Sequence, residues 1–110
     1  MIDWTRLKDL RDEVGAEEFE DVVTLFLDEV DDAVEKLRSA PDTATLEDDL
    51  HFLKGSALTL GFRDLSDLCQ TGETEASQGR ADTVDVAAIL NSYQNSKHVF
   101  LSDRAAHMTY

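Results

Sequence analysis

Apolar residues recur at alternating steps of four and three along most of the chain, and this spacing constrains the fold more than any other feature. The clearest run consists of Phe19, Val23, Phe26, Val30, Ala33 and Leu37. Because an α-helix has about 3.6 residues per turn, this spacing places the side chains of the run on one helix face. No stretch shows the sustained alternation with a period of two that indicates a half-buried strand. The pattern therefore predicts an all-α protein.

Residues that cap or break helices divide the chain into five helical segments. Asp3 is a suitable N-cap for a short helix over residues 4–14, which Gly15 can end. Acidic residues from position 17 suit the positive end of a second helix, which Pro41 stops. Three further helices are expected over residues 46–60, 62–79 and 84–100, the last capped by Asp82 or Thr83.

Four long amphipathic helices with short connections predict an antiparallel four-helix bundle. The short additional N-terminal helix is expected to lie across one end of it. A chain of 110 residues is the size of one domain, and 42% hydrophobic residues can supply its core. Since no internal repeat, low-complexity segment or linker is seen, we expect a single domain over residues 1–110.

The charge of the chain excludes some partners. Ten Lys and Arg against twenty-four Asp and Glu give a net charge of −14, which repels nucleic acid and anionic membrane. The apolar runs are too short to span a membrane, and residues 1–4 lack the features of a signal peptide. The single cysteine, Cys69, cannot form an internal disulfide. These observations favour a cytoplasmic protein, in which most of the acids line solvated helix faces.

The helix over residues 46–60 carries the most informative surface. If the direction of Leu46 is set to zero, His51 lies at about 140° and Lys54 at about 80° around the helix axis. Gly55 lies at about 180° and Leu58 at about 120° by the same geometry. His51 is therefore expected to point to the surface, with a lysine, a glycine and an apolar residue close to it.

This group of residues suits an imidazole that carries a phosphoryl group. Gly55 would leave open space for the group, Lys54 would supply a cation, and Leu58 would offer apolar surface to an incoming protein. A glycine inside a helix costs about 1 kcal/mol relative to alanine, so it calls for a reason. A solvated histidine and lysine remain the simpler interpretation at this point. Glu47 and His51 could share a metal ion, but no other His or Cys lies nearby in sequence, so no metal is expected.

Residues 51–61, HFLKGSALTLG, resemble the signature of the histidine-containing phosphotransfer (Hpt) domain family, roughly H-x-L-K-G-S-S/A-x-x-L-G. The family commonly follows this with L-x-x-L-C-x-x-L-E, and the matching residues here are Leu65, Leu68, Cys69 and Glu73. Residues 25–28 and the start at Ile2 and Asp3 are also similar to Hpt domains, so the resemblance covers nearly the whole chain.

The resemblance implies a phosphoryl carrier of two-component phosphorelays. Nε2 of His51 would take the group from a phosphorylated aspartate, with its Mg²⁺, on a response-regulator receiver domain and pass it to another receiver. A hybrid histidine kinase is a further expected partner. The chain has no Walker A or protein-kinase glycine loop, so no ATP-dependent enzyme activity and no cofactor are expected.

The resemblance also assigns supporting roles. Glu73 is expected to accept the Nδ1–H of His51, and Leu58 and Leu27 are expected to contact the receiver. A monomer is expected, and the initial methionine favours a free-standing protein. Two other functions stay open: an adaptor that binds a receiver without carrying phosphate, and an acidic helical module that masks a basic partner.

The sequence departs from the family at two places. Gly72 stands where a large apolar residue is usual, which predicts a flexible or under-filled spot. Asp48 and Asp49 precede the histidine where neutral or basic residues are more usual, and they add negative field beside a site for a dianion. The lifetime of the phosphohistidine is therefore left open.

Overall fold

A computed structural model describes residues 2–39 and 42–107 of the chain. Its α-helices, in chain order, are α1 (Trp4–Val14), α2 (Ala16–Ser39), α3 (Leu46–Leu60), α4 (Arg63–Ser77) and α5 (Val86–His107), with the 3₁₀ turn η1 (Ala81–Thr83) before α5. The prediction of an all-α fold is confirmed. The last helix extends beyond the predicted residue 100.

The residues that cap the helices agree with the sequence at some ends and differ at others. The Asp3 side chain accepts a hydrogen bond from the backbone N–H of Arg6, as expected for an N-cap. Gly61 ends α3 in the left-handed conformation with a φ of 73°, which glycine adopts without steric cost. The expectation that Asp82 or Thr83 caps the last helix is wrong, because both lie in η1 and Asp85 accepts the bond from Ala88 N–H instead. Pro41, predicted to stop α2, lies outside the described residues.

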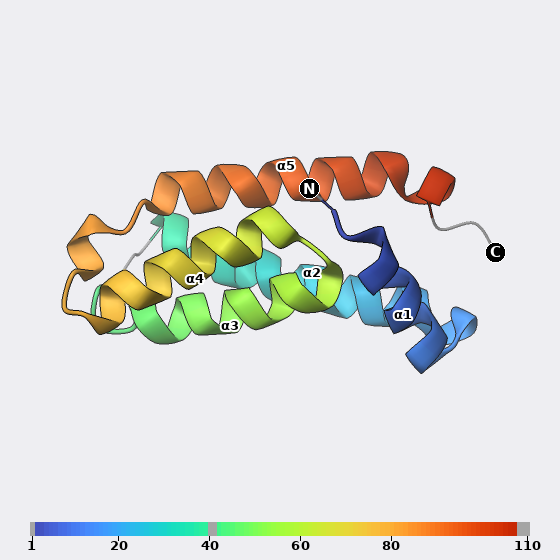
Figure 1. The fold of residues 1–110 in the computed structure, drawn as a ribbon, viewed down its shortest axis with the longest axis horizontal. Helices are drawn as coiled ribbons and strands as arrows, with labels where there is room; N and C mark the ends of the chain where they lie inside the picture. Colours follow the sequence, from blue (N-terminus) through green and yellow to red (C-terminus); the bar gives the residue numbers. More distant parts are fainter. Residues whose placement is uncertain (1, 40–41, 108–110) are drawn as a thin grey trace.

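The four long helices form a closed ring of neighbours. Helix α3 packs against α2 and α4, and α5 packs against α4 and α2. Successive helices run in opposite directions, and α1 lies at one end of the bundle, against α2 and α3 (Figure 1). The predicted antiparallel four-helix bundle with an additional N-terminal helix is confirmed.

The first residues are fixed to the corner between α3 and α4. The Asp3 N–H donates to the Gly61 carbonyl at 2.7 Å, and Ile2 forms an isolated bridge with Phe62. A Cβ at Gly61 would come within 2.5 Å of the Asp3 carbonyl oxygen. Glycine is therefore required there both by the backbone conformation and by this close approach.

The buried face of α2 is wider than the predicted stripe. Leu27 and Val34 are buried, whereas Phe26 and Ala33, which belong to the predicted stripe, are only partly buried. The reason is that α2 packs against α1, α3 and α5. Leu27 is 9% exposed, so the expectation that it offers surface to a partner is wrong.

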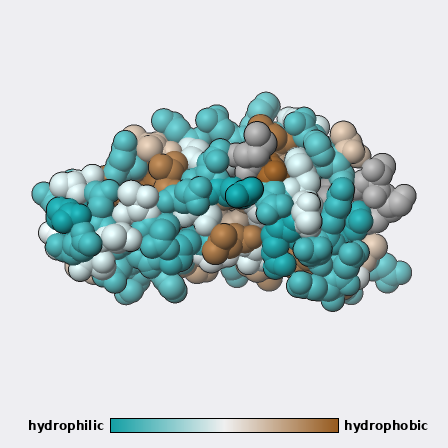
Figure 2. All heavy atoms as spheres, in the orientation of Figure 1, coloured by the Kyte–Doolittle hydropathy of each residue, from teal (hydrophilic) through white to brown (hydrophobic). Residues whose placement is uncertain are grey.

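Polar side chains cover most of the face shown in Figure 2, and apolar side chains appear there only in small spots. Among the described residues, no helix has the length and apolar character that crossing a membrane requires.

Candidate functional site

Helix α3 presents His51 on its outer face. The predicted inward stripe of this helix is fully or almost fully buried, and consists of Leu46, Leu50, Leu53, Ala57 and Leu60. That packing fixes the rotation of the helix and leaves the His51 side chain 71% exposed. The imidazole is therefore accessible to another protein.

Helix α4 places a carboxylate beside this imidazole. The inward face of α4 buries Cys69 and Gly72, so that Glu73, the next residue, lies at the edge of the α3–α4 seam. One Glu73 carboxylate oxygen, Oε2, lies 2.8 Å from His51 Nδ1. The other, Oε1, accepts a hydrogen bond from Lys54 Nζ at 2.6 Å. The structure thus brings together three residues that the sequence predicts as site residues, while their roles in transfer stay predictions.

The charges of this cluster decide which imidazole nitrogen carries the hydrogen. The hydrogen bond from Lys54 lowers the pKa of the Glu73 carboxyl. Partial burial raises this pKa, but the bond from His51 also lowers it, and the net shift is downward. Glu73 is therefore ionised near neutral pH and can only accept hydrogen bonds. The hydrogen between the two groups must then belong to Nδ1, so a neutral imidazole keeps its lone pair on Nε2.

Lys54 is held by α4 rather than extended into solvent. Its Nζ also donates to Gln70 Oε1 at 3.1 Å, and Gln70 Nε2 donates to Thr74 Oγ1 at 3.1 Å. The sequence interpretation missed Gln70, whose position three residues before Glu73 puts both side chains on one helix face. Contact of the Lys54 ammonium with phosphoryl oxygens stays a prediction.

The surface that follows His51 along α3 is open at Gly55 and apolar at Leu58. A Cβ at Gly55 would meet no atom within 4 Å, so the space one turn from the imidazole is free. Leu58, two turns along, is 55% exposed, as its predicted position requires. Phe52 is also exposed, and the sequence interpretation did not single it out although it adjoins the histidine.

Gly72 does not leave the spot that the sequence predicted to be flexible or under-filled. A Cβ there would lie 2.8 Å from Leu50 Cδ1 and 3.1 Å from Val84 Cγ1. The expectation is wrong because these neighbouring side chains already occupy the volume that a large apolar residue would need.

The acids before the histidine differ in their surroundings. Asp49 points toward α2, where one oxygen lies 3.1 Å from Lys36 Nζ and the other accepts from Thr45 Oγ1 at 3.1 Å. Its charge is therefore partly balanced, whereas Asp48 is exposed.

Among the described residues, no group of three or more His, Cys, Asp and Glu side chains could hold a metal ion. Burial raises the pKa of the Cys69 thiol to about 12, so this buried cysteine is protonated near neutral pH.

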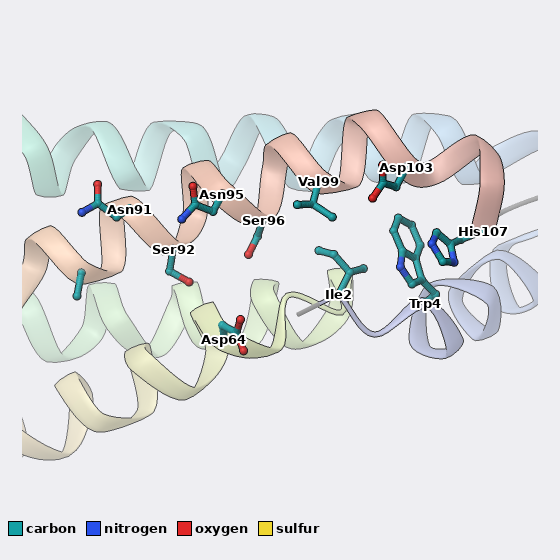
Figure 3. Close-up of a pocket in the computed structure, with 11 residues that line it drawn as sticks. Ile2, Trp4, Asp64, Asn91, Ser92, Asn95, Ser96, Val99, Asp103 and His107 are labelled. Carbon is teal, nitrogen blue, oxygen red and sulfur yellow. The ribbon is translucent and has the colours of Figure 1, made fainter.

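A separate hollow of about 780 Å³ lies along α5. Figure 3 shows Ser92 and Asn95 of α5 across from Asp64 of α4, with Ile2 near Val99 and Trp4 beside His107 further along the helix. At one end, the His107 ring stacks on the Trp4 ring with a centroid distance of 4.4 Å. This hollow shares no residue with the His51 cluster.

Comparison with models of protein families finds a match to the Hpt domain over residues 21–98. The chain belongs to the Hpt domain family. The resemblance of residues 51–61 to the Hpt signature is thereby confirmed, and the matched range contains the whole His51 cluster. Hpt domains act as phosphocarrier modules, not kinases, in the phosphorelays of two-component signalling. Comparisons with curated proteins and with solved structures gave no match.

Proposed function

We propose that this Hpt domain carries a phosphoryl group on Nε2 of His51. It takes the group from a phosphorylated aspartate of one receiver domain and passes it to the aspartate of another. The observation that carries the proposal is the 2.8 Å contact between Nδ1 and Glu73 on a largely exposed imidazole. This contact directs the reactive lone pair to Nε2.

The transfer step follows from this arrangement. The Nε2 lone pair attacks phosphorus, the bond from phosphorus to the aspartate oxygen breaks, and its electron pair leaves with the carboxylate. The imidazole keeps its Nδ1 hydrogen and gains positive charge as the new N–P bond forms. The Glu73 carboxylate, which accepts that hydrogen, stabilises the charge. The hydrogen bond from Lys54 lowers the pKa of Glu73 and so favours its ionised form.

The surroundings of His51 support docking of a receiver. Open space at Gly55 accommodates the phosphoryl group, and exposed Leu58 and Phe52 offer apolar contact area. The family places receiver domains and histidine kinases among the partners, and we propose a hybrid histidine kinase as the source of the donor receiver. We further propose that residues 1–110 act as one cytoplasmic, monomeric domain.

Transfer from a receiver labelled with radioactive phosphate tests the proposal. The wild-type protein is expected to acquire an acid-labile, alkali-stable label, and His51→Gln is expected to acquire none while keeping its helical circular dichroism. His98→Gln is the matched control, because His98 is an exposed histidine elsewhere in the bundle, on α5. Labelling of His51→Gln would place the phosphate on another residue. A wild-type protein that binds the receiver without taking label would be an adaptor, and one that does neither would support the acidic module.

A further inference from the structure

Helices α3 and α4 approach each other closely at Gly72. A Cβ at this position would lie 2.8 Å from Leu50 Cδ1, 3.1 Å from Val84 Cγ1 and 3.6 Å from Ile89 Cδ1. Carbon atoms in ordinary contact are about 3.5–4.0 Å apart. Any side chain at residue 72 would therefore require its neighbours or the helix itself to move.

Two of these three neighbours are enclosed by the core. Leu50 is fully buried and Ile89 is 1% exposed, so their methyl groups already contact other core atoms. Leu50 directly precedes His51, and Gly72 directly precedes Glu73. The close contact of the two helices thus lies next to the hydrogen bond that joins the imidazole to the carboxylate.

We propose that Gly72 is a positioning residue for phosphotransfer. Because it has no side chain, α4 can lie close enough to α3 for Glu73 to reach both His51 and Lys54. The inference rests on the proposed role of His51 and adds a requirement on the separation of the two helices.

The distances show how sensitive the arrangement is. Relieving the contact of a new Cβ with Leu50 takes at least about 0.7 Å of movement. If α3 and α4 move apart by this distance, the 2.8 Å contact between Nδ1 and Glu73 lengthens to about 3.5 Å. Hydrogen bonds between nitrogen and oxygen lie mostly between about 2.7 and 3.2 Å, so Glu73 would no longer fix the tautomer of the imidazole.

The experiment compares wild type, Gly72→Ala, Leu50→Val and Gly72→Ala/Leu50→Val. The valine lacks the Cδ1 methyl that the new Cβ would meet. Nitrogen-15 chemical shifts of the His51 ring at alkaline pH report which nitrogen holds the hydrogen, independently of any transfer. Transfer from a phosphorylated receiver is measured on the same samples. Val30→Ala serves as a control, since it disturbs a buried residue of α2 rather than the α3–α4 seam.

In wild type, the hydrogen is expected on Nδ1. In Gly72→Ala, we expect a mixture of tautomers and transfer slowed about tenfold. The double variant is expected to show the same His51 tautomer and transfer rate as Leu50→Val. Val30→Ala is expected to keep the wild-type tautomer and rate despite lower stability.

A Gly72→Ala protein with wild-type tautomer and rate would overturn the inference. If Gly72→Ala does not fold, a folded double variant whose tautomers stay mixed, unlike those of Leu50→Val, would overturn it as well. Failure of the wild type to take phosphate would instead contradict the proposed function, while the ring nitrogen shifts would still test the role of Gly72.

Discussion

Two carboxylates in this bundle join a lysine and a second hydrogen-bond donor across a helix seam, yet one bonds a largely exposed imidazole and the other a buried phenol. In the α3–α4 seam, Glu73 bonds Lys54 at 2.6 Å and His51 at 2.8 Å. The corresponding cluster of the α2–α5 seam consists of Asp31, Lys97 and Tyr93.

The difference between the clusters lies in the second donor. Tyr93 is fully buried, and burial, followed by its bond to Asp31, raises the pKa of its hydroxyl far above the ordinary value. It therefore stays protonated, and its hydroxyl links α5 to α2. The His51 side chain is 71% exposed and has open space at Gly55 one turn away. The same ionic pairing is thus structural in one seam and suited to chemistry in the other, depending on the exposure and type of the second donor.

A side chain in the open space at Gly55 should have the largest effect on the rate of phosphoryl transfer. Gly55→Gln is expected to slow transfer about a hundredfold or more, because the new side chain occupies the volume of the phosphoryl group. Stability should rise by up to about 1 kcal/mol, since glutamine favours a helix more than glycine does. Stopped-flow transfer kinetics and urea denaturation measure the two effects. A wild-type transfer rate would reduce the role of Gly55 to packing.

The two lysines provide a matched comparison. Lys54→Ala should slow transfer about tenfold to a hundredfold, the range for losing one charged contact of about 1.4–3 kcal/mol. Lys97→Ala should leave transfer unchanged and cost about 1 kcal/mol of stability or less. Both are measured with the same receiver at one salt concentration. Equal effects of the two substitutions on transfer would show that the seams do not differ as proposed.

An exposed leucine near His51 can be compared with one on another helix. Leu58→Glu should weaken receiver binding and transfer about tenfold, since it adds charge to an apolar contact beside acidic residues. Leu25→Glu, on the exposed face of α2, should leave both unchanged. Titration calorimetry gives the affinity for the receiver. A large drop in melting temperature for Leu58→Glu would place the residue in the core and the docking face elsewhere.

The smallest effect on transfer is expected in the α2–α5 seam. Tyr93→Phe keeps the buried ring but removes the hydroxyl donor to Asp31, which should cost about 1–2 kcal/mol of unfolding free energy. Transfer should remain within about twofold of wild type, because this cluster holds helices together and contacts no reacting atom. Urea denaturation and transfer assays check the two parts. Loss of transfer without loss of stability would connect Tyr93 to the reaction.

The sequence predicted features that depend on local spacing. The stripe of α3, from Leu46 to Leu60, follows from helical periodicity, and so does the outward direction of His51. The wider buried face of α2, including Leu27, could not be predicted because it depends on how many helices surround α2.

Features that depend on the distance between helices were harder to predict. Glu73 was named from the family resemblance, because no spacing within one helix shows which residue of α4 faces α3. The close contact at Gly72 and the bond from Lys54 to Gln70 exist only once α3 and α4 are packed. The sequence therefore predicted His51, Lys54 and Glu73 as site residues, but not the close contact at Gly72 or the bond from Lys54 to Gln70.

The identity of the phosphorylated nitrogen tests the proposed role of Glu73 most directly. Nuclear magnetic resonance of the nitrogen-15-labelled protein, after transfer from a phosphorylated receiver, distinguishes the two ring nitrogens by their coupling to phosphorus. We predict phosphorus on Nε2 of His51, with the Nδ1 hydrogen still bonded to Glu73. Phosphorus on Nδ1, or on any other residue, would contradict the claim that Glu73 directs the reaction to Nε2.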